Sequence, residues 1–140
     1  MKILIRNVLA LILGFLLGSV VNMTIIMLGP ILIPPPPGVD GTNLESLVAT
    51  MHLFEPKHFV APFVAHSMGT LVGALTAFLI ALSYGRLFAY LIGFTFLIGG
   101  FSMVIMIPSP LWFSLLDLIV AYLPMAWLGI FIGRRISASK

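Results

Sequence analysis

The chain has 140 residues, of which 61% are hydrophobic and only 8% are charged, and its formal net charge is +3 at pH 7. Soluble domains carry about a quarter charged residues, so this composition excludes a soluble globular protein and indicates an integral membrane protein. Cysteine is absent, which excludes disulfides, thiolate metal sites and cysteine nucleophiles, and the basic residues are too scattered to form a nucleic-acid-binding patch.

Four apolar segments are each long enough to cross a bilayer, which takes about 20 residues of helix. They predict an all-α protein with a single four-helix transmembrane domain. In chain order the predicted spans cover residues 7–31, 56–82, 87–107 and 111–132. The first segment begins like a secretory signal, but its apolar run continues to Ile33 without a small-residue cleavage site, so we expect it to be retained as a helix.

Small residues follow one face of each of the first two spans. Residues with this spacing let helices approach closely in lipid, and they are also candidate surfaces for assembly with other chains. The faces comprise Gly14 and Gly18 in the first span and Ala65, Gly69, Gly73 and Ala77 in the second. Asn22 shares the first of these faces, and we expect its amide to hydrogen-bond a neighbouring helix because an unpaired amide in a span is costly.

A more polar segment, residues 34–55, joins the first two spans. The four prolines Pro34 to Pro37 predict a stiff, extended spacer. Thr42 and Glu45 then fit a capping box with Thr42 as the N-cap, which predicts a short amphipathic helix over residues 43–53. Because this helix is too short to span, we expect it to lie at the membrane interface.

The third span has few polar side chains, whereas the fourth contains Asp117 and a predicted kink at Pro124. The distribution of basic residues predicts the orientation of the bundle. With both termini cytoplasmic, Lys57 is the one basic residue outside, as the positive-inside rule requires. The cytoplasmic residues are then Lys2, Arg6, Arg86, Arg134, Arg135 and Lys140. We expect the protein in a bacterial inner (plasma) membrane.

With this orientation, all histidines and all acidic residues fall in the outer half of the molecule. His66 and Asp117 lie at similar depths inside two different spans. An ionisable group inside a span usually faces inward and pairs with another group, so these two are predicted partners. A carboxylate would fix the imidazole tautomer and favour its protonated form. The pair would either lock two helices together or handle a proton or a metal ion.

The same outer region offers a candidate metal site. Its predicted ligands are His52, Glu55, His58, His66 and Asp117. Glu55 and His58 have the i, i+3 spacing found in helical metal sites, although Glu55 also suits a helix start, where it favours the helix dipole. Zinc is the expected metal. Copper is an alternative because thioether sulfur suits Cu(I), although methionine is also ordinary apolar filler. The methionines in question are Met23, Met27, Met51, Met103 and Met106.

Three functions remain open from the sequence. The first is binding or transport of a divalent metal ion or a proton at the outer cluster. The second is a structural or accessory role, in which the small-residue faces assemble the chain into a homo-oligomer or a larger membrane complex. The third is a membrane-embedded enzyme acting on a lipid-soluble substrate through the His66–Asp117 pair or a metal-bound water. No phosphate-binding loop or hydrolase motif assigns a catalytic residue.

Overall fold

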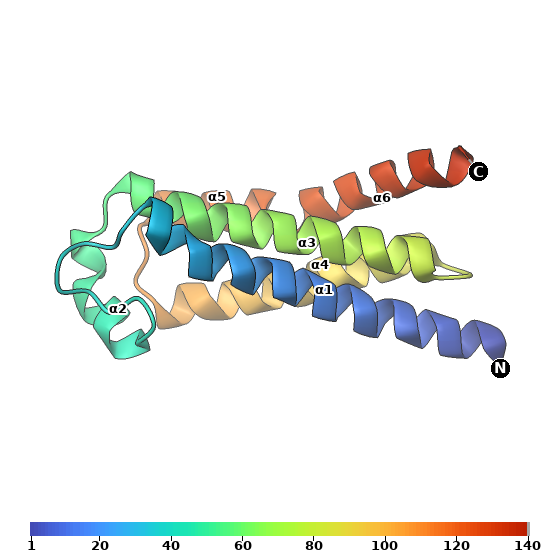
Figure 1. Ribbon diagram of the computed structural model, residues 1–140, viewed down its shortest axis with the longest axis horizontal. Coiled ribbons are helices and arrows are strands. Elements are labelled where there is room, and N and C mark those ends of the chain that lie inside the picture. The colour runs from blue at the N-terminus through green and yellow to red at the C-terminus, as the bar shows by residue number, and fades with distance from the viewer. Residues whose placement is uncertain (140) are drawn as a thin grey trace.

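The computed structural model describes residues 1–139, in which every secondary-structure element is a helix and there is no strand. Within this range four helical rods are long and apolar enough to cross a membrane, as the sequence predicts (Figure 1). The rods are α1 (Lys2–Leu32), α3 (Val60–Ile80) with the preceding 3-10 turn η2 (Pro56–Phe59), α4 (Gly85–Met106), and α5 (Leu111–Val120) followed by α6 (Leu123–Ala138). Both termini lie at the same end of the bundle (Figure 1).

The closest contact in the bundle joins α1 to α3, and glycines make it possible. A Cβ atom built on Gly73 would lie 2.8 Å from the Gly14 carbonyl oxygen, and one on Gly69 would lie 2.8 Å from the Gly18 oxygen. Only glycine allows backbones to approach this closely. The two small-residue faces therefore pack against each other within one chain, where a second chain cannot reach them.

The amino-terminal part of α1 holds the turn between α3 and α4. The Asn7 side chain is buried; its amide nitrogen donates to Ser83 Oγ at 2.9 Å, and its oxygen accepts the Leu82 N–H at 3.1 Å. Within the part of the chain that the structure describes, Asn22 does not form the hydrogen bond to a neighbouring helix that the sequence predicts. Its Oδ1 atom is buried without a hydrogen-bond partner among residues 1–139, so the predicted tie to a neighbouring helix is absent there.

The fourth span is interrupted rather than kinked. The chain leaves helical geometry at Tyr122, where φ is −117° and ψ is −83°, and α6 begins at the next residue. Pro124 has no N–H to donate to the carbonyl of Val120, which removes one helical hydrogen bond at this point. Figure 1 shows the resulting gap between α5 and α6.

Residues 33–55, which join α1 to the turn before α3, are named the outer segment after their predicted side of the membrane. They fold over the end of the bundle opposite the termini (Figure 1). The outer segment contains α2 (Leu44–Thr50) and the 3-10 turn η1 (Met51–Leu53). The N-cap of α2 is Asn43, whose side-chain oxygen accepts the Ser46 N–H, and not Thr42 as the sequence suggests. Thr42 instead binds Asp40, donating from its hydroxyl at 2.6 Å and from its N–H at 2.9 Å. These hydrogen bonds hold the pKa of Asp40 below its usual value.

Candidate functional site

The structure brings His66 of α3 and Asp117 of α5 into direct contact. His66 Nδ1 lies 2.8 Å from Oδ1 and 2.9 Å from Oδ2 of the carboxylate. Asp117 is only 2% exposed, whereas the His66 side chain is 22% exposed. The carboxylate is thus enclosed, and the imidazole forms the accessible side of the pair.

Tyr122 completes this group from the break between α5 and α6. Its hydroxyl donates to Asp117 Oδ2 at 2.8 Å, and its ring stacks on His66 with centroids 5.9 Å apart. In a continuous helix, side chains five residues apart point about 140° away from each other. The interruption at Tyr122 therefore allows this side chain to turn back onto a carboxylate in the preceding helix.

Gly100 of α4 provides the space for the tyrosine. A Cβ atom at this position would collide with the Tyr122 hydroxyl, whereas one at the neighbouring Gly99 would meet nothing within 4 Å. Two adjacent glycines thus have different roles. Gly100 lets α4 lie against the site, and Gly99 faces away from it.

One set of proton positions satisfies the hydrogen bonds of the group. In this set an ionised Asp117 accepts from both the Tyr122 hydroxyl and His66 Nδ1–H. Neutral His66 then carries its proton on Nδ1 and leaves Nε2 as an acceptor. Nε2 has no hydrogen-bond partner among residues 1–139. This is the arrangement of a base oriented by a carboxylate, which stabilises the imidazolium that forms when Nε2 takes a proton.

The His66–Asp117 pair borders a cavity of about 320 Å³ in the outer half of the bundle. Its walls come from α1, α3, α4 and α5, and Leu47 and Met51 of the outer segment also line it. Most of the exposed lining is apolar, and Phe59 and Phe113 pack at 4.6 Å between ring centroids beside it. Ligand sites in proteins have volumes of roughly 300–1,000 Å³ and combine apolar walls with a few polar groups. The cavity fits that description.

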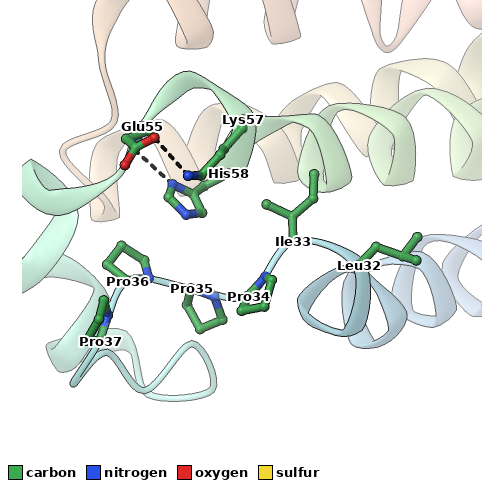
Figure 2. Close-up of a pocket in the computed structure, with 9 residues that line it drawn as sticks. All are labelled: Leu32, Ile33, Pro34, Pro35, Pro36, Pro37, Glu55, Lys57 and His58. Atoms are coloured by element: carbon green, nitrogen blue, oxygen red, sulfur yellow. Dashed lines mark hydrogen bonds and ion pairs between the residues drawn. The ribbon is translucent and has the colours of Figure 1, made fainter.

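The other predicted site residues lie apart from this pair. His52 is exposed, and Glu55 is the N-cap of η2. The backbone N–H of Glu55 donates to His58 Nδ1 at 2.9 Å, and the Glu55 carboxylate forms an exposed ion pair with Lys57 at 2.9 Å (Figure 2). Lys57 holds the pKa of Glu55 below its usual value. The spacing of Glu55 and His58 therefore serves the start of a helix.

No three histidine or carboxylate side chains in the described part of the chain form a group that could hold a metal ion. The five predicted ligands separate into the His66–Asp117 pair, the Glu55–His58 cap and the exposed His52. The five methionines considered as copper ligands also lie in different surroundings. Met51 is buried against Phe59, Ile107 and Phe113, and Met103 lines the cavity. Met23, Met27 and Met106 are exposed on the sides of the bundle.

Tyr122, Gly100 and the cavity were not predicted from the sequence. One signal for Tyr122 was present, because a tyrosine two residues before a proline in an apolar span carries a hydroxyl that needs a partner. No protein-family model matches the chain, and no curated protein or solved structure matches it.

Proposed function

We propose that this membrane protein binds a small lipid-soluble molecule in the outer cavity and exchanges a proton with it at His66. The observation that carries the proposal is an apolar cavity bordered by an imidazole whose Nδ1 atom is held by Asp117. Both termini are cytoplasmic in this proposal and the cavity is near the outer surface. Among residues 1–139, five of the six basic residues lie at the end of the bundle where α1 begins and α6 ends, and this placement supports the orientation.

The chemistry follows from the surroundings of the pair. The apolar walls favour the hydrocarbon part of a ligand, and the His66–Asp117 pair offers it a hydrogen-bonding group at the wall formed by α3 and α5. A ligand hydroxyl would donate to Nε2 and, on transfer of its proton, leave an oxyanion beside an imidazolium. The buried carboxylate stabilises that cation, and the Tyr122 hydroxyl keeps the carboxylate in place.

A proton fits this site better than a metal ion does. Zinc sites in proteins use at least three side-chain ligands, and the described residues bring only two titratable groups together here, besides Tyr122. The small-residue faces give no separate support for an assembly role, because they are buried between α1 and α3.

Native mass spectrometry of the protein in lipid nanodiscs tests the binding part of the proposal. We expect a co-purified small molecule on the native chain and its loss from Val104→Trp, because Val104 lines the cavity. The control is Ile105→Trp, since Ile105 is 72% exposed and lies outside the cavity lining. Equal occupancy in Val104→Trp and the native chain would contradict the proposal.

Nitrogen NMR of histidine-labelled protein tests the proton part. We expect neutral His66 to carry its proton on Nδ1, and Asp117→Asn to change that tautomer preference while His52 and His58 signals stay unchanged. The signal is assigned with His66→Gln. A neutral His66 that carries its proton on Nε2 in the native chain would rule out the proposed acceptor.

A further inference from the structure

A second hollow lies outside the cavity, at the end of the bundle covered by the outer segment. This outer groove has a volume of about 430 Å³. One wall runs from Leu32, the last residue of α1, along the extended stretch to Pro37, and the other is formed by Glu55, Lys57 and His58 at the start of η2 (Figure 2). It carries the exposed Glu55–Lys57 ion pair and so opens to water or the headgroup region.

The outer groove and the inner cavity share part of their lining. Ile33, Pro35 and His58 line both hollows. The same three residues therefore lie at the boundary of the two spaces. The sides of the bundle offer no comparable polar approach, because their exposed residues are mainly large apolar side chains.

The two sides of this boundary differ in stiffness. The four prolines fix φ along the extended stretch, so that wall resists movement. His58 is held at one ring nitrogen, where Nδ1 accepts the Glu55 N–H, while its other nitrogen points across the groove towards the prolines (Figure 2). The imidazole is thus the side chain whose size and position set the width of the opening.

We propose that the outer groove is the entrance to the cavity and that His58 controls passage through it. This proposal rests on the proposed function. It narrows the ligand from any lipid-soluble molecule to a small amphiphile that arrives from the outer water or headgroup layer. A bilayer lipid entering sideways between helices is the competing route. The size of the side chain at position 58 then determines which molecules reach His66.

Thiol accessibility tests the route without requiring the natural ligand. The chain contains no cysteine, so a single introduced cysteine is its sole thiol. We place it at Val104 in the cavity, or at Ile105 on the outside of α4 as a control, and embed the protein in nanodiscs. The probe is a permanently charged trimethylammonium methanethiosulfonate, which does not enter hydrocarbon, and mass spectrometry follows its reaction.

We expect position 58 to change the reaction rate of Val104→Cys in both directions. His58→Ala should speed it, and His58→Trp should slow it about tenfold, equivalent to a barrier about 1.4 kcal/mol higher. The rate of Ile105→Cys should not follow the residue at position 58. If a substitution at position 58 simply loosened the fold, the reactions of Val104→Cys and Ile105→Cys would both become faster.

Ile33→Trp narrows the same opening from its other side, and provides the test if His58→Trp does not fold. Unchanged reaction of Val104→Cys in the tryptophan variants would overturn the entrance, because the probe would then reach the cavity by another aqueous route. The two proposals can fail separately. A rate controlled by position 58 without any co-purified molecule would keep the entrance and remove the proposed ligand, whereas a bound molecule with a rate independent of position 58 would do the reverse.

Discussion

Asp117 is the residue on which the polar contacts of the outer half converge. Its carboxylate receives hydrogen bonds from His66 on α3 and from Tyr122 at the start of α6. A buried ionised carboxylate is very costly without such partners. The two partners therefore satisfy a carboxyl group that lies at 2% exposure inside an apolar bundle.

The two asparagines of α1 provide a test at the residue scale. We expect Asn7→Leu to lower the free energy of unfolding by about 2 kcal/mol, because it leaves the part-buried Leu82 N–H and Ser83 hydroxyl without their partner. Asn22→Leu should be neutral or stabilising by about 1 kcal/mol, because it removes a buried oxygen that has no partner.

Unfolding in mixed detergent micelles, followed by circular dichroism, measures both changes. Leucine has the same branched skeleton as asparagine, and because the same substitution is made at both positions, the difference between them reports on hydrogen bonding. Equal destabilisation by the two substitutions would show that the Asn7 contacts do not set the stability of the turn between α3 and α4.

At the scale of elements, the α1–α3 contact depends on glycine. We expect Gly73→Ala to destabilise the chain by about 1–3 kcal/mol, because the new methyl group would meet the Gly14 carbonyl and force the helices apart. Gly99→Ala is the matched control. It meets open space and should stabilise α4 by up to about 1 kcal/mol through its higher helix propensity.

The same unfolding assay measures the stability of both alanine variants, and analytical ultracentrifugation measures their oligomeric state. Because the small-residue faces pack within one chain, Gly73→Ala should lower stability without changing that state. Dissociation of an oligomer by Gly73→Ala, with the stability of each chain retained, would place this contact between chains instead.

The elements were predictable where their signals are local. The apolar runs indicated the four spans, and Pro124 marked the region where the fourth is interrupted. The pairing of Tyr122 with Asp117 could not be read in this way, because regular helical spacing would point the two side chains apart. The hydrogen bond between Asn7 and Ser83 joins residues 76 positions apart and depends on how α1 meets α3.

At the scale of the whole molecule, the orientation in the membrane is open to direct measurement. We expect a membrane-impermeant maleimide to label Glu45→Cys on α2 in intact cells, and Ser137→Cys near the end of α6 only after permeabilisation. Both side chains are exposed, and they lie at opposite ends of the bundle. Labelling of Ser137→Cys alone in intact cells would reverse the proposed orientation.

The interruption at Tyr122 also divides the fourth span mechanically. α6 packs along α3 and α4 over much of its length, whereas α5 touches them at few positions. The half of the span formed by α6 is thus the more extensively packed one, and α5 is held by Asp117 to His66 and by Phe113 to Phe59. Phe113 and Asp117 of α5 line the cavity, whereas no residue of α6 does. The break at Tyr122 therefore separates the half of the span that forms the cavity wall from the half that packs along the neighbouring helices.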